Sequence, residues 1–193
     1  QAIDYIEAAV ERFGIDCQFY RRPLYRIVTT KDKKAIKILD AEREAMTRAG
    51  LKVETIEDSA LPFPIEKGLK IDGQAQFNPL SYAHGLAKAI SQRGVEIYEH
   101  SPVRNIDYYQ GLIETDTAHL NAKHIVHATH TPKGVSLLQT MLLPSREYGV
   151  SAKINSDAYP SGIFFVHDPF HSIRSYQYKN DDYLMVIGEQ HKT

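Results

Sequence analysis

Three histidines recur at intervals of three residues, at His124, His127 and His130. Imidazole nitrogens are frequent zinc ligands, and on a helix three such side chains would share one face. The segment is instead predicted to be a strand, where side chains alternate between two faces, so His127 points away from His124. The three histidines are therefore better explained as ordinary polar side chains than as a metal site. The same explanation is favoured for His167 and His171, which lie in a predicted turn.

The other side chains with catalytic potential are one thiol and twelve phenols. No neighbouring charge pattern argues for an activated thiolate at Cys17. Tyr148, Tyr176 and Tyr178 lie on predicted strands, where phenol rings offer apolar faces with polar tips to a substrate cavity. The alternative is that these rings serve in core and edge packing.

A glycine-rich phosphate loop is missing from the sequence. No Gly-x-Gly-x-x-Gly occurs, and Gly73, Gly85 and Gly94 are too widely spaced for a phosphate-cradling turn. The sequence therefore disfavours a complete nucleotide-binding domain within these residues.

Composition limits the class of protein. The 193 residues are 42% hydrophobic and 24% charged, which is typical of a globular chain with one large domain or two small lobes. A net charge of -1 gives no reason to expect nucleic acid or an anionic membrane as a partner, and no apolar run is long enough to cross a bilayer. A single cysteine fits a reducing compartment, and we expect a cytoplasmic protein.

The elements that position these residues centre on the stretch 71–130, which reads as strand, helix, strand, hairpin, strand. Asn78 and Pro79 start the helix, Gly94 ends it, and strands are predicted at Val95–His100, Val103–Tyr109 and Ile125–Thr129. A strand, helix and strand in this order predict parallel pairing through a right-handed crossover, provided that both strands lie in one sheet.

The flanking regions add helices and further strands. Before the central stretch the sequence predicts a helix ending at Gly14, strands Cys17–Tyr20 and Tyr25–Thr30 around Pro23, a helix over Lys31–Ala49 and a short strand Val53–Ile56. After it the sequence predicts a brief helix or loop at Val135–Leu143 and strands Arg146–Lys153, Gly162–His167, Ser172–Tyr178 and Tyr183–Gly188. Their short links favour an antiparallel meander. The expected fold class is α/β (α+β), an antiparallel sheet packed with helices plus the strand-helix-strand unit.

Four segments also resemble a known family. They are Gln76-Phe-Asn-Pro79, Arg93-Gly-Val-Glu-Ile97, Ser101-Pro-Val103 and Val126-His-Ala-Thr-His130. Together they resemble the middle of the D-amino-acid oxidase and glycine oxidase superfamily of FAD-dependent oxidoreductases. The segment 129–132, Thr-His-Thr-Pro, is similar to the branch whose members carry a Rieske [2Fe-2S] domain further along.

The resemblance implies which residues approach the cofactor. It places the backbone of Val103 against FAD, and Ala128 and Thr129 beside the dinucleotide. His130 follows that turn and would lie near the flavin.

The resemblance also implies a role for Arg174. Glycine-oxidase-like members have a strand ending in an arginine that receives the substrate carboxylate, then a turn and an apolar strand ending in glycine, matched here by Arg174 and Gly188. A guanidinium suits this task because its planar fork makes two parallel bonds to a carboxylate. Ile173 stands where the family usually has proline, and the alternative is an ordinary exposed or ion-paired arginine. Tyr148 and Tyr176 are the further substrate-binding candidates.

These expectations combine into one hypothesis. Residues 1–193 form a central fragment of a larger flavoprotein, with a substrate-binding sheet at about 51–78 and 144–190 and a cofactor-side unit at about 79–132. The parent protein oxidises an amine or amino acid by hydride transfer to FAD, and the fragment alone retains neither FAD nor activity. Its partners are the substrate and the remaining FAD-binding domain. The alternative is a non-catalytic ligand-binding or protein-interaction module.

Overall fold

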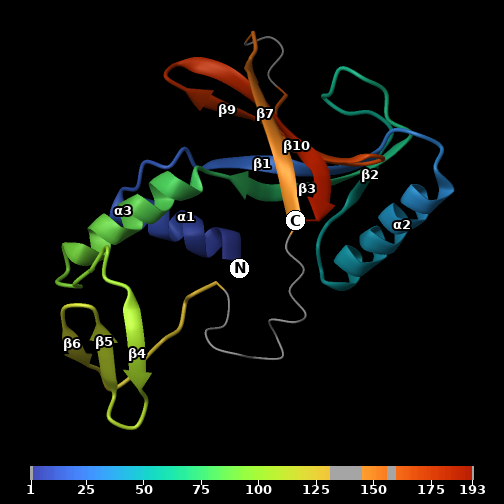
Figure 1. Cartoon of the computed structure of the whole chain (residues 1–193). Helices are drawn as coiled ribbons and strands as arrows, with labels where there is room; N and C mark the ends of the chain where they lie inside the picture. The colour runs from blue at the N-terminus through green and yellow to red at the C-terminus, as the bar shows by residue number, and fades with distance from the viewer. Residues whose placement is uncertain (1, 131–144, 156–159, 193) are drawn as a thin grey trace. The chain divides into compact units, whose positions relative to one another are not determined.

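The chain divides into two compact units. The computed structural model describes residues 2–130, 145–155 and 160–192. Its larger unit combines Gln1–Leu86 with Pro144–Thr193, and its smaller unit is Ala87–Leu143 (Figure 1). No helix among the described residues is long and apolar enough to cross a membrane.

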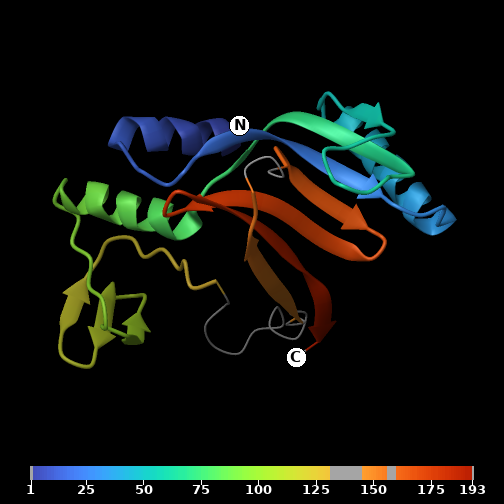
Figure 2. The same ribbon diagram turned by 90° about the horizontal axis from the view of Figure 1, so that it is seen from above.

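A seven-stranded sheet forms the centre of the larger unit, with the strand order β2-β3-β1-β8-β9-β10-β7 (Figures 1 and 2). Its strands are β1 (Tyr20–Val28), β2 (Glu54–Ile56), β3 (Lys67–Gln76), β7 (Ser145–Lys153), β8 (Ile163–His167), β9 (Phe170–Tyr178) and β10 (Asp181–Lys192). β8, β9 and β10 form an antiparallel meander as expected, but the first of the four predicted strands, β7, does not precede β8 in it and pairs with the far side of β10 instead. The sheet joins the last third of the chain to the first through parallel pairing of β1 with β8.

Strand β1 corrects the prediction of two strands around Pro23. One continuous strand runs through this residue, and its pairing with β3 shifts register between Arg22 and Leu24. Proline has no backbone N–H to donate to the ladder, so the irregularity falls where that donor is missing. Cys17–Phe19 lies outside the strand.

Both faces of β1 are buried. Ile27 and Val28 are adjacent and fully buried, so alternation sends them to opposite faces of the sheet. Ile27 belongs to a cluster with Leu61, Phe164, Val166 and Ile173, and Val28 to a cluster with Ala35, Leu39, Leu69 and Ile71. The second cluster includes side chains of α2 (Lys33–Arg48), which begins two residues after the predicted start at Lys31, with the Asp32 carboxylate accepting a bond from Lys34 N.

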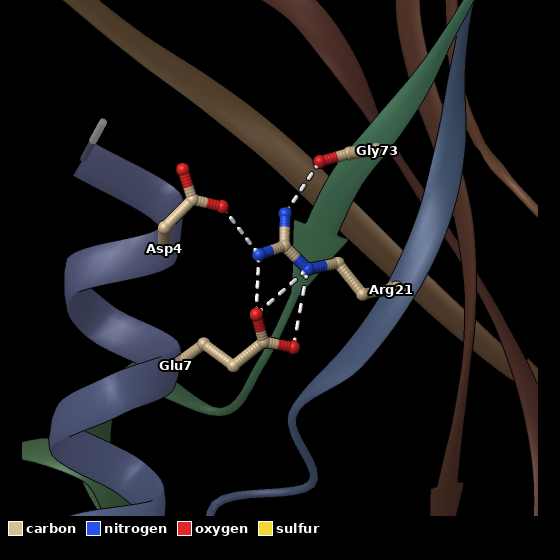
Figure 3. Close-up of polar contacts among 4 residues, drawn as sticks. All are labelled: Asp4, Glu7, Arg21 and Gly73. Carbon is tan, nitrogen blue, oxygen red and sulfur yellow. Dashed lines mark hydrogen bonds and ion pairs between the residues drawn. The ribbon is translucent and has the colours of Figure 1, made fainter.

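Helix α1 (Ala2–Phe13) is tied to the sheet by Arg21 of β1 (Figure 3). The guanidinium donates to Asp4 Oδ1 at 2.7 Å, to the Gly73 carbonyl of β3 at 2.6 Å and to the Glu7 carboxylate. These bonds from Arg21 lower the pKa of Asp4 and of Glu7. One cation thus joins three elements at the end of β1 where Tyr20 begins the strand.

The smaller unit contains a three-stranded antiparallel sheet of β4 (Val103–Asp107), β5 (Leu112–Thr115) and β6 (His119–Asn121). Helix α3 (Pro79–Ser91) begins in the larger unit and ends in the smaller one. Its start was predicted correctly, since Asn78 Oδ1 accepts bonds from Leu80 N and Ser81 N at 3.1 Å. Gly94 takes the positive φ of 86° that was expected for the residue ending the helix.

Two predicted strands of this region are wrong. Val95–His100 and Ile125–Thr129 form no ladder with any described residue, and Val95, Ile97 and Val126 are exposed. A strand exists only where a neighbour supplies hydrogen-bond partners, which apolar alternation alone cannot guarantee. β3 and β4 also lie in different sheets, so the condition for a parallel crossover is not met. The prediction for Val135–Leu143 lies outside the described residues.

Candidate functional site

A hollow of about 540 Å³ opens in the larger unit, within the size range of small-molecule sites. Its wall comes from the start of β1, the end of β3, the start of α3 and the strands β8, β9 and β10. The described lining residues are Gln18, Tyr20, Ala75, Gln76, Phe77, Asn78, Pro79, Ile163, Arg174, Ser175, Tyr176 and Met185.

Arg174 lies on the sheet wall of this hollow. It stands directly opposite Ile163 of β8 and Met185 of β10 in the ladder. Side chains directly opposite each other point to the same face with Cβ atoms roughly 5 Å apart, so the arginine rises between two apolar neighbours. Tyr176, two residues along β9, shares this face, while Ile173 points to the opposite face and into the core.

The charge of Arg174 is not neutralised by any described residue. The side chain is half-buried, its Nε atom is buried without a hydrogen-bond partner, and its Nη2 donates only a long bond of 3.4 Å to Ser172 Oγ. No carboxylate is found among the described residues lining the hollow. Burial lowers the pKa of Arg174, which means that the surroundings disfavour its charged form. Such a cation is costly unless an anion joins it.

Tyr176 is held by a hydrogen bond and a ring contact. Its hydroxyl lies 2.9 Å from Ser151 Oγ, and Ser151 Oγ donates to the Leu184 carbonyl at 3.2 Å. Because that carbonyl can only accept, the serine proton is used there and the tyrosine hydroxyl donates to the serine. The ring also stacks on Tyr183, with centroids 5.4 Å apart. Tyr176 therefore contributes a fixed aromatic wall, and its proton is already engaged.

The two glutamines of the hollow are also anchored. Gln76 Nε2 donates to the Ser175 carbonyl at 2.7 Å, which joins β3 to β9, and Gln18 Nε2 donates to the Gln177 carbonyl at 3.0 Å. The Oε1 atom of Gln76 is buried and has no partner among the described residues. Neither glutamine was anticipated from the sequence, since their proximity to Arg174 depends on strand order.

Tyr148 lies elsewhere. It stands opposite Gly188 in the ladder, which by alternation is the face opposite to that of Arg174 and Tyr176. Its side chain is 66% exposed and stacks on His191 with centroids 5.1 Å apart. The hollow thus brings together Arg174 and Tyr176 but not Tyr148, whose role in substrate binding stays a prediction.

The cofactor candidates all belong to the smaller unit. Val103 opens β4, the edge strand of the three-stranded sheet, and pairs with Thr115 of β5. Ala128, Thr129 and His130 follow β6 in an exposed segment outside any ladder, and His130 has a positive φ of 64°. Edge strands and irregular exposed segments are places where a backbone can contact a ligand, and contact of these four residues with FAD stays a prediction.

The remaining histidines form no metal site within the described part of the chain, where no group of three or more metal-ligating side chains occurs. His127 Nε2 lies 3.0 Å from the Tyr108 hydroxyl. His167 is packed beside Arg26 and Glu42, and burial together with the Arg26 charge lowers the pKa of its imidazole.

Comparison with known proteins assigns the chain to a family of flavoproteins. The model of the FAD dependent oxidoreductase family (DAO) matches residues 1–192. The chain belongs to this family, and the resemblance seen in the sequence is confirmed. The mixed fold of a large sheet with helices is that of its structural neighbours, so the predicted fold class is confirmed as well.

Particular relatives narrow this class. A putative Rieske 2Fe-2S iron-sulfur protein, YhfW of Bacillus subtilis, is 28% identical over 197 residues that span the whole chain but 38% of YhfW, which supports the predicted Rieske branch. Glycine oxidase from Geobacillus kaustophilus has the same fold, with a TM-score of 0.72, 19% identity and coverage of 98% of this chain and 53% of the oxidase. L-proline dehydrogenase from P. horikoshii also has this fold, with a TM-score of 0.72 and 12% identity. The match covers 98% of this chain and 54% of the dehydrogenase. The chain therefore spans about half or less of these relatives.

Proposed function

We propose that this chain supplies the substrate-binding sheet and part of the cofactor-binding surface of an FAD-dependent oxidoreductase that acts on an amino acid or a related amine bearing a carboxylate. The single observation that carries this proposal is the half-buried Arg174, a cation that has no carboxylate partner among the described residues and lies on the wall of a ligand-sized hollow. The family provides the reaction class, and its structural neighbours named above act on glycine and proline.

The role of Arg174 follows from its geometry and charge. A substrate carboxylate would accept bonds from the guanidinium fork and neutralise the charge that burial disfavours. Neighbours on β8 and β10 flank the guanidinium, so a bound carboxylate is oriented by the sheet and shielded from water on both sides. This fixes the carbon next to the carboxylate relative to the protein, which is the positioning that the reaction needs.

FAD would be held in part by Val103, Ala128, Thr129 and His130, and when bound it supplies the acceptor for the hydride removed from substrate. The sequence has no glycine-rich phosphate loop. We therefore propose that another part of the parent protein binds the pyrophosphate, and that residues 1–193 alone bind FAD weakly and have no turnover. Because the relative YhfW is named as a putative Rieske 2Fe-2S protein, we also propose that the parent protein carries a Rieske [2Fe-2S] domain. Within this proposal, residues 51–78 and 144–190 serve the substrate and 79–132 the cofactor, and the single thiol, Cys17, agrees with a cytoplasmic location.

The test compares Arg174→Gln with Arg43→Gln in the FAD-containing protein. Arg43 is exposed on α2 and serves as the matched control. Losing charge-assisted bonds to a carboxylate should lower kcat/KM for amino acids by roughly 10- to 100-fold, whereas Arg43→Gln should change little. Bleaching of the flavin on anaerobic addition of substrate reports the reaction itself. A colourless protein that binds carboxylates without bleaching would favour the non-catalytic module instead.

A further inference from the structure

Apart from Arg174 and the Oε1 atom of Gln76, several polar side chains that line the hollow are engaged by the protein itself. Besides the two glutamines and Tyr176, Asn78 caps α3 through its Oδ1, and Ser175 donates from its hydroxyl to the Pro160 carbonyl at 3.2 Å. Among the described lining residues, Arg174 alone carries a formal charge, and none is acidic. The described lining thus offers one cationic fork, one unpartnered amide oxygen at Gln76, and apolar or aromatic surface beside the fork.

Apolar side chains lie next to that fork. Ile163 and Met185 are its direct neighbours across the sheet, and the wall continues with the rings of Tyr176, Tyr20 and Phe77. A ligand anchored by a carboxylate on Arg174 must therefore place its next atoms against hydrocarbon and rings. A second carboxylate on the ligand would find no second cation among the described lining residues and would lose its water.

Resting on the proposed function, we infer that the substrate is a monocarboxylic amino acid or N-substituted amine with a bulky apolar or aromatic side chain, and that Ile163 and Met185 are its specificity-determining residues. The hollow is far larger than a carboxylate with one methyl group requires. Each methylene group removed from water contributes roughly a fourfold gain in affinity, so the affinity of a carboxylate ligand should rise with the length of its apolar chain.

The test uses unreactive carboxylates, so it does not depend on turnover. Isothermal titration calorimetry of this chain with acetate, 3-phenylpropionate and succinate compares a short apolar ligand, a long apolar ligand and a ligand with a second charge. We expect 3-phenylpropionate to bind at least tenfold more tightly than either of the others. Arg174→Gln should abolish binding of all three.

Two variants of the apolar wall make the inference specific. Met185→Gln keeps the length of the side chain and adds a polar amide, so it should weaken the binding of 3-phenylpropionate at least fivefold and the binding of acetate by a smaller factor. Ile163→Val removes one methylene with little risk to folding and should weaken 3-phenylpropionate by roughly two- to fourfold. Ile38→Ala, on the exposed side of α2, is the control and should change the affinity for neither acetate nor 3-phenylpropionate.

The outcomes separate this inference from the proposed function. Binding of all three acids that depends on Arg174 but is equal in strength, or strongest for succinate, overturns the apolar side chain and leaves the carboxylate role intact. Binding that survives Arg174→Gln, or no binding of any acid, overturns the carboxylate role and this inference with it.

Discussion

Replacing Arg174 by methionine tests whether the site trades stability for ligand binding. The substitution keeps a long apolar side chain between Ile163 and Met185 but removes a half-buried charge whose Nε atom has no partner in the described part of the chain. An unsatisfied buried polar group costs about 1–3 kcal/mol, so Arg174→Met should raise the free energy of unfolding by about that amount. Residues built only for binding commonly behave in this way.

The control is the same substitution at another half-buried arginine of the sheet. Arg26 Nη2 pairs with Glu42 Oε1 at 2.7 Å, and its Nε donates to His167 Nε2 at 3.2 Å. Arg26→Met would leave Glu42 half-buried without its cation and should lower the free energy of unfolding by about 1–3 kcal/mol. Two identical substitutions in one sheet are therefore expected to have opposite signs.

Urea titration followed by tyrosine fluorescence and by circular dichroism measures both effects, since the chain has no tryptophan. With a slope of about 2 kcal/mol/M, the midpoint should rise by roughly 0.5–1.5 M for Arg174→Met. Saturating 3-phenylpropionate should stabilise the wild-type chain, by about 2.7 kcal/mol at 100 times its Kd, and should not stabilise the variant. A loss of stability in Arg174→Met comparable to that in Arg26→Met would refute the reasoning, because it would mean that Arg174 is structurally satisfied.

Three further substitutions test other parts of the fold. Burial would raise the pKa of Asp168, but hydrogen bonds from Thr30 and Thr29 outweigh this effect and hold the pKa below 3.8. The ionised Asp168 therefore stabilises the folded state fully above pH 3.8, and this contribution is lost as the pH falls through the lower pKa of the folded state. Asp168→Asn should therefore cost about 1–3 kcal/mol at pH 7 and flatten the acid limb of a thermal unfolding profile, and an unchanged limb would contradict this. Gly188→Ala places a Cβ 2.2 Å from His171 Cδ2 and should lower the free energy of unfolding, measured by urea titration, by about 1–3 kcal/mol. Adding His171→Ala to this variant should restore most of the lost stability. If it does not, the loss comes from backbone strain and not from the clash. Arg21→Ala should speed hydrogen exchange in α1, and equal exchange rates would show that apolar packing alone holds that helix.

Helices were predictable from the sequence because their signals are local. Asn78 and Gly94 each act within one turn of the chain, and the structure places them at the two ends of α3. The cap at Asp32 was not recognised, and the start predicted for that helix, Lys31, was two residues early. The four C-terminal strands were found for the same reason, since turn residues separate short apolar runs. Strands without neighbours, such as those predicted at Val95–His100 and Ile125–Thr129, could not be rejected from local pattern, because pairing depends on distant residues.

The candidate site was only partly predictable. Arg174 was identified through its resemblance to a family motif, and Tyr176 through its place on the same strand. Ile163 and Met185 became visible as its neighbours only through the ladder register, which the sequence does not specify. The opposite faces of Tyr148 and Tyr176 likewise follow from the pairing of β7 with β10 rather than from β7 alone.

The parallel contact of β1 with β8 has a consequence for biosynthesis. Residues 24–27 find their partners at 163–166, so on a ribosome the middle of the sheet stays open until about 140 further residues have been made. Contacts between such distant residues slow folding, and an uncovered strand edge is a place where chains aggregate. Newly made protein should thus need protection by chaperones until β8 emerges and closes the gap.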